Sequence, residues 1–178
     1  MKESRAKPKN NIVEKFDKIN TDTSVLDIVK VVCSSYCEQL DEYMETIDDT
    51  IVTRSITEIS TVLIEEWILN ITSILYFTIS GLEEVGIKED MCKSIRQELY
   101  TKAHSDASGT VAEKTNKATL AVQEEDLVLQ IYSRAYKRIK QKVDAGYEML
   151  NSMKKVMSAR ITDGELSNSR YNGKEARE

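Results

Sequence analysis

The chain has 178 residues and a formal net charge of -5; 31% of its residues are charged and 40% are hydrophobic. With six glycines and one proline, it lacks the turn residues that β-sandwiches and α/β enzymes need at their many connections. Length and composition therefore favour one all-α domain with a moderate core.

Charge is distributed unevenly along the chain. Residues 24 to 100 contain 15 acidic and 5 basic side chains, whereas residues 129 to 160 contain 8 basic and 2 acidic ones. The net charge is therefore a poor guide to binding partners, and the acidic middle and the basic segment have to be considered separately.

The first 21 residues are polar and basic and include the only proline, Pro8, so we expect a flexible arm with helical potential from residue 12 to 19. Asp22 and Ser24 offer N-cap oxygens for a first long helix. Apolar residues then recur at spacings of three and four from Val25 to Ile47, which predicts a helix with one buried face.

Residues 50 to 80 are rich in Ile, Val and Thr but contain no turn signal, and their length favours an uninterrupted helix over a strand. The least charged run, residues 67 to 82, is about 16 residues long and falls short of the ~20 that span a membrane. Such a helix must be covered by other helices or subunits. Gly81 and Gly86 predict a kink or break, after which residues 88 to 102 continue as helix.

The segment "HSDASGTVAEK" marks a boundary, because Gly109 ends one helix and Thr110 with Glu113 forms a T-x-x-E capping box for the next. A continuous helix is expected from residue 111 to about 160, roughly 75 Å long. With the preceding helices it predicts a long antiparallel hairpin with coiled-coil-like packing and an additional N-terminal helix, which oligomerises along exposed apolar faces. The domain boundaries expected are a basic arm (1–21), a helical domain (22–160, acidic over 22–104 and basic over 110–160) and a disordered tail (161–178).

Turning each residue by ~100° separates an apolar face of the last helix from its cations. The face expected to be buried comprises Val128, Tyr132, Ala135, Ile139, Val143, Gly146, Leu150, Met153 and Met157. Arg134, Lys137 and Lys155 lie opposite it, with Lys140 beside them. Arg138 and Lys142 flank the apolar face, and Tyr132 and Tyr136 lie on or beside it, so these tyrosines are poorly placed to stack on bases.

The basic face has three interpretations. It is a solvated surface, a membrane-binding surface, or a surface that binds phosphates. A soluble helix usually mixes charge signs, and a membrane-binding one carries Trp, Phe or Leu rather than Ala, Gly and Met. Stacking of copies would join these faces into a positive surface on which counterion release favours phosphate binding.

Other candidate sites are weaker. Cys33 and Cys37 share one helical face, but His104 is the only histidine, so four metal ligands are not in place. Adjacent carboxylates such as Glu65 and Glu66 point about 100° apart on a helix. There is no glycine-rich phosphate loop and no G-x-S-x-G motif. We expect free thiols in a reducing compartment, no metal, no cofactor and no enzymatic activity.

The segment "GTVAEKTNKATLAVQEEDLVLQIYSRAYKRIKQKVDAGYEMLNSMKKVMSAR" resembles the phage recombination mediator family typified by UvsY, over roughly residues 64 to 160. In that family a short Gly/Val/Thr-Glu-Lys-like segment introduces a long helix. The matching positions are Gly109, Val111, Glu113, Lys114, Lys117, Ala118, Glu125, Ala135, Ile139, Leu150 and Arg160. The acidic helix from residue 24 to about 49 has no counterpart, and the apolar run after Ile59 is unusually dense.

The resemblance implies a homo-oligomer of helical hairpins in the bacterial host cytoplasm that binds single-stranded DNA. It would load a RecA-like recombinase by displacing single-strand-binding protein. The DNA-binding residues expected are Arg134, Lys137, Arg138, Lys140, Lys142 and Lys155, helped by Lys114 and Lys117. About five phosphate contacts would give a log-log salt slope near -3.5. The alternatives are a structural or scaffolding coiled-coil protein without DNA binding, for instance a virion assembly or adaptor component, and a regulatory inhibitor acting through the acidic helix.

Overall fold

The computed structural model describes the backbone of residues 25–175 and the side chains of residues 25–164. Over this range the chain forms helices α2 (Val25–Thr53), α3 (Thr61–Asp106), α4 (Val111–Ala121) and α5 (Gln123–Glu175), with no strand. The expected all-α fold is confirmed. The basic arm expected at residues 1–21 lies outside the described residues.

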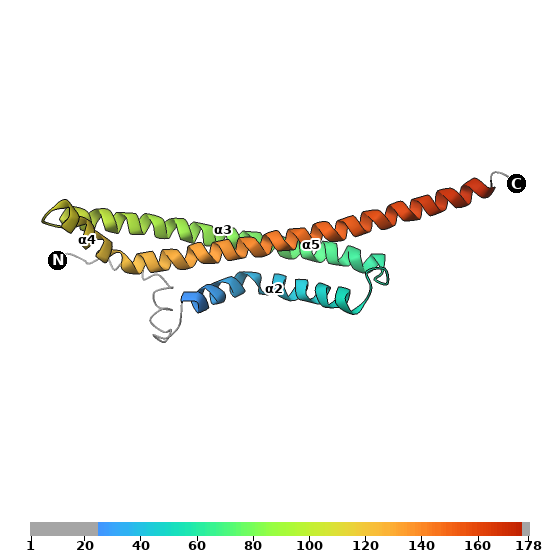
Figure 1. Ribbon diagram of the computed structural model, residues 1–178, viewed down its shortest axis with the longest axis horizontal. Helices are drawn as coiled ribbons and strands as arrows, with labels where there is room; N and C mark the ends of the chain where they lie inside the picture. The colour runs from blue at the N-terminus through green and yellow to red at the C-terminus, as the bar shows by residue number, and fades with distance from the viewer. Residues whose placement is uncertain (1–24, 176–178) are drawn as a thin grey trace, which may run out of the picture.

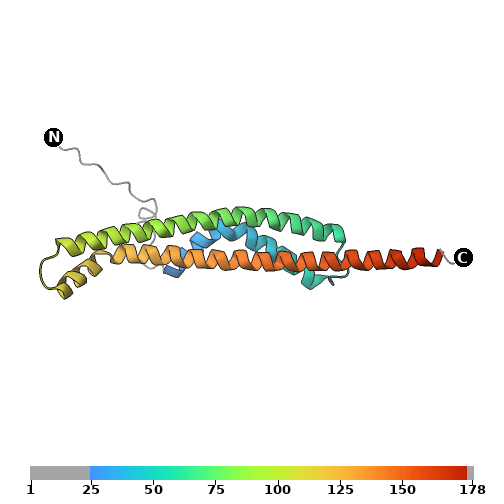
Figure 2. The same cartoon turned by 90° about the horizontal axis from the view of Figure 1, so that it is seen from above.

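The three long helices lie side by side in an elongated bundle (Figures 1 and 2). Arg96 pairs with Asp126 near one end of the hairpin, and Arg160 reaches the Ile59 carbonyl near the other, so α3 and α5 run antiparallel. The expected long hairpin is thereby confirmed. The additional helix, α2, runs parallel to α5, since Cys33 contacts Ala135 and Asp41 pairs with Lys142.

The core fills the space between α2, α3 and α5, and its side chains recur at the helical period that the sequence predicted. The buried face of α5 is the expected one, with Val128 and Met157 only half-buried at its margins. The fully buried side chains of the core include Leu40 and Ile47 of α2, Ile64, Ile71 and Leu75 of α3, and Ile139 of α5.

The prediction of an uninterrupted helix over residues 50 to 80 is wrong, because helix α2 ends at Thr53 and helix α3 begins at Thr61. Side-chain hydroxyls form local hydrogen bonds here that compete with the backbone hydrogen bonds of a helix. The Thr53 hydroxyl donates to the Asp49 carbonyl, and the hydroxyl oxygens of Ser55 and Thr57 lie 2.8 Å apart. The Ser60 hydroxyl accepts from the Leu63 N–H at 3.2 Å and caps α3. The break lets α2 fold back along the hairpin.

The break predicted at Gly81 and Gly86 is also absent, since α3 passes through both positions. These glycines allow close packing instead. A Cβ on Gly81 would lie 2.5 Å from Tyr36 Cδ1, and one on Gly86 would lie 3.2 Å from Tyr136 Cε2. Their small size admits aromatic rings from α2 and α5.

The capping box is present, since the Thr110 hydroxyl accepts from the Glu113 N–H and the Glu113 carboxylate accepts from the Thr110 N–H. The single helix expected from residue 111 to 160 is interrupted at Val122, which separates α4 from α5. Three acidic residues, at 124 to 126, stabilise the new N-terminus. At its other end, α5 continues to Glu175, so residues 161–175 extend the helix where a disordered tail was expected.

Candidate nucleic-acid interface

The exposed surface of α5 carries four cations within two turns, Arg134, Lys137, Arg138 and Lys140, which we call the basic cluster and which cover about 160° of the helix circumference. All four side chains are exposed, and within the described part of the chain none forms an ion pair. The cluster spans about 9 Å along the helix, at 1.5 Å per residue. Four unneutralised cations at this spacing form a surface suited to phosphate oxygens.

The other predicted residues are placed differently. Lys142 is half-buried and forms an ion pair with Asp41 of α2. Lys155 is exposed but lies 15 residues beyond Lys140, about 22 Å along α5. These two cations are therefore separate from the basic cluster.

Lys114 and Lys117 lie on α4, at the closed end of the hairpin (Figure 1). Lys114 is half-buried, and Lys117 donates to the Ser108 carbonyl at 3.1 Å. The first turn of α5, with its acidic residues, separates them from Arg134. The eight predicted residues thus do not form one surface.

Two acidic residues interrupt the positive surface farther along α5. Asp144 and Glu148 are exposed. The spacings of seven, four and seven residues from Lys137 through Asp144 and Glu148 to Lys155 place all four on one side of the helix. A surface of α5 without acidic side chains is therefore limited to the basic cluster itself.

Tyr147 is an exposed aromatic residue on α5 that the sequence reasoning did not consider; 43% of it is accessible. It follows Lys140 by seven residues and precedes Lys154 by seven, so all three lie near one edge of α5. This spacing was the available signal. By contrast, Tyr132 is buried and Tyr136 packs against Gly86, as the sequence indicated.

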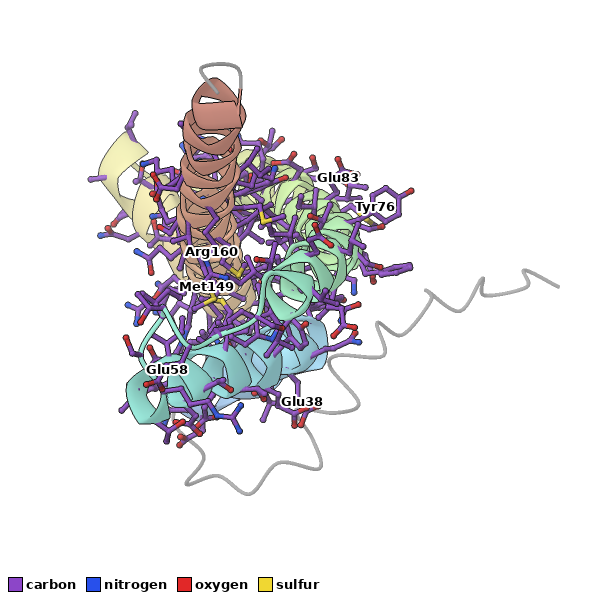
Figure 3. The ribbon with its side chains drawn as sticks, turned by 90° about the vertical axis from the view of Figure 1, so that its right-hand side faces the viewer. Glu38, Glu58, Tyr76, Glu83, Met149 and Arg160 are labelled. Atoms are coloured by element: carbon purple, nitrogen blue, oxygen red, sulfur yellow. The ribbon has the colours of Figure 1, made fainter. Side chains whose placement is uncertain are left out.

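Arg160 has a structural role. Its guanidinium donates to the Ile59 carbonyl at 2.7 Å and to the Ile56 carbonyl, and thus holds the loop between α2 and α3 against α5. In Figure 3, Arg160 and Met149 lie on the same side of α5, the side that faces the other helices. Its charge is satisfied by the loop, so it does not belong to the exposed basic surface.

Among the described residues, the three thiols are not grouped with other potential metal ligands. Cys33, Cys37 and Cys92 are free and buried, and burial raises the pKa of Cys37 to about 11. Metal binding requires thiolates, and in the described part of the chain no three His, Cys, Asp or Glu side chains cluster to hold an ion. An apolar cavity of about 240 Å³ near Trp67 and Met149 has Ser152 as the one hydroxyl-bearing residue in its lining, so it presents no ionisable side chain for acid/base chemistry.

By length and composition, α3 would suffice to cross a membrane. A core helix of a helical bundle has the same composition, and one face of α3 forms part of this core. Comparison with known proteins adds no assignment: no protein-family model, curated protein or solved structure matches the chain.

Proposed function

We propose that the chain is a non-enzymatic recombination mediator of phage recombination and repair, which binds single-stranded DNA and loads a RecA-like recombinase onto it in the host cytoplasm. The observation that carries the proposal is the basic cluster: four exposed cations without ion-pair partners among the described residues, in a chain of net charge -5. The resemblance of residues 64 to 160 to the mediator family supports the same function.

DNA binding rests on phosphate contacts from the basic cluster, with release of condensed counterions as the driving force. Four contacts per subunit give an expected log-log salt slope of about -2.8 for a single strand. This is shallower than the slope expected from sequence, because Lys142 is neutralised by Asp41. Tyr147 provides a ring on which one base stacks.

The acidic outer face of α2 is the surface proposed for protein partners. Its exposed carboxylates are those of Glu38, Glu42, Glu45, Asp48 and Asp49. Like charges four residues apart destabilise a helix by a few tenths of a kcal/mol each. A basic surface on the recombinase or on single-strand-binding protein would relieve this repulsion, and in the free oligomer the same charges favour solubility.

The experiment is a fluorescence anisotropy titration of a labelled, unstructured ~30-nucleotide single strand at several salt concentrations, with a duplex in parallel. The test variant is Arg134→Glu/Lys137→Glu/Lys140→Glu. Its control is Lys30→Glu/Lys93→Glu/Lys102→Glu, which makes the same charge change at exposed positions on α2 and α3. We expect salt-sensitive binding to the single strand that the test variant loses and the control largely keeps.

Absence of binding at ~100 mM salt, or equal losses in both variants, would contradict the proposal. The first result would favour the second candidate, a scaffolding protein that docks on acidic proteins or assembles with itself. The exposed apolar side of α3 is the observation that favours this candidate.

A further inference from the structure

The outer side of α3 carries an exposed apolar stripe. Val62, Leu69, Tyr76, Ile87 and Met91 are all more than half exposed, and their spacing places them on one side of the helix. Phe77 lies beside them and meets the Tyr76 ring edge-to-face at 5.5 Å between centroids. Figure 3 shows Tyr76 and Glu83 pointing away from α2 and α5. No described helix covers this side.

The apolar stripe has the size of an interface. From Val62 to Ile95 it spans about 50 Å, and a helix is about 10 Å wide, so a second helix along it would bury roughly 500 Å² on each partner. The total of roughly 1,000 Å² reaches the lower limit for a biological interface. The roughly 500 Å² on one copy lies within the range of the largest apolar patch on a typical monomer, about 300–600 Å², and such patches are often functional.

The apolar residues of the stripe face one another when two copies of α3 are placed side by side in opposite directions. In an antiparallel pair with its two-fold axis near residue 78, Val62 faces Ile95 and Leu69 faces Ile87. A shallow groove of about 530 Å³, lined by Ile87, Met91 and Ile95 among others, would receive the Val62 end of the other copy. Such self-matching is what a two-fold symmetric interface requires.

Charge favours the same arrangement. A parallel pair would bring the acidic pairs at 65–66 and 83–84 against their own copies, and like charges across an interface are destabilising. The antiparallel pair instead places Glu83 and Glu84 of one copy opposite Ser73 and Thr72 of the other, and keeps only Glu66 opposite Asp90 as a like-charge contact. A lipid surface is a poorer occupant, because membranes that bind amphipathic helices attract Lys and Arg, whereas the stripe is flanked mainly by glutamates.

We infer that α3 pairs antiparallel with α3 of a second copy of this chain, through the stripe from Val62 to Ile95. The basic cluster lies on α5 and is no part of this contact. The α3 interface can therefore be tested independently of DNA binding.

The test is sedimentation velocity of the full chain without DNA, at 0.1 and 1 M NaCl. We expect the wild type to be dimeric or larger at both salt concentrations, since apolar burial resists salt. Leu69→Glu/Ile87→Glu should at least halve the mass or raise the dissociation constant more than tenfold. The control is Val31→Glu/Val52→Glu on α2, where Val31 is as exposed as Leu69, at 70% each. Circular dichroism checks that both variants fold.

Register is tested with single cysteines, because the native thiols are buried. Leu69→Cys should cross-link to Ile87→Cys when the two variants are mixed and should not cross-link to itself. A monomeric wild type, equal effects of both double variants, or self-cross-linking of Leu69→Cys would overturn the inference. Binding of a monomer to neutral lipid vesicles would likewise overturn it and identify a membrane as the occupant.

Discussion

Gly146 of α5 lies directly against Leu75 of α3: a Cβ on Gly146 would lie 2.8 Å from Leu75 Cδ2 and 3.4 Å from Leu40 Cδ1. Both leucines are fully buried, so neither can move aside without disturbing the core. All three long helices meet at this position, and a glycine there lets them approach closely.

We therefore expect Gly146→Ala to destabilise the protein. Overpacking costs about 1–3 kcal/mol, and the better helix propensity of alanine offsets about 0.5–1 kcal/mol of it. Urea denaturation followed by circular dichroism measures the difference. Gly164→Ala is the control, since its Cβ would meet nothing within 4 Å; an equal loss there would show that close packing is not the cause.

Arg160→Met should lower the free energy of unfolding by about 1.5–3 kcal/mol, because hydrogen bonds to a charged group are lost and the Ile56 and Ile59 carbonyls lose their donor. Arg134→Met, on the exposed surface, should change it by less than about 0.5 kcal/mol. Chemical denaturation of both variants measures the two changes in the free energy of unfolding. Similar values would argue that Arg160 does not stabilise the loop.

The buried thiols predict a loss of stability in alkaline solution. Burial raises the pKa of Cys37 from an ordinary value of 9.0 to about 11. The folded state therefore keeps a proton that the unfolded state releases. Stability from this group is complete below pH 9 and falls between pH 9 and 11, by on the order of 1 kcal/mol per pH unit.

Denaturation curves across that pH range should show a smaller decline for Cys37→Ala than for the wild type. An unchanged decline would assign the pH dependence to other groups. Burial also raises the pKa of Tyr132, so this residue contributes to the loss of stability in alkaline solution in the same sense as Cys37.

Asp144→Lys/Glu148→Lys should strengthen DNA binding, because it joins the basic cluster to Lys155 in one positive surface. With about six or seven phosphate contacts the salt slope should steepen from about -2.8 to between -4 and -5. Anisotropy titrations measure both quantities. Glu42→Lys/Glu45→Lys on α2 makes the same charge change elsewhere, and an equal gain in that variant would mean that only net charge matters.

Tyr147→Ala should weaken binding to a single strand by about 1–3 kcal/mol, the usual contribution of one stacked base. Tyr147→Phe keeps the ring and should bind like the wild type, and the salt slope should be the same in all three proteins because no cation changes. An alanine variant with unchanged affinity would remove Tyr147 from the interface.

The fold was predictable where a local pattern determined it. The helical period identified the buried face of α5, and the residues Thr110 and Glu113 identified the turn of the hairpin. The break after Thr53 was missed because no glycine or proline marks it; it depends on hydroxyl bonds and on Arg160, 101 residues away from Ile59. The break at Val122 has a sequence signal, because Glu124, Glu125 and Asp126 are the acidic residues expected in the first turn of a new helix.

The candidate site was predictable only in part, for a related reason. Exposure of Arg134 and Lys137 follows from the angle between residues on one helix. Lys142 is neutralised by Asp41, a residue of another helix that lies 101 positions away in the sequence. The helical spacing within α5 alone cannot predict this contact. The interruption by Asp144 and Glu148 could have been found, because it needs only the helical spacing.

The capped turn after α3 has a consequence for how the chain acquires its structure. Partners across the hairpin are 30 residues apart at Arg96 and Asp126 but 101 apart at Ile59 and Arg160. Loop closure is entropically cheapest nearest the turn, and each contact formed there shortens the loop that the next one must close. We expect α3 and α5 to zip together from the Thr110 end, with α2 docking last onto a hairpin already in register.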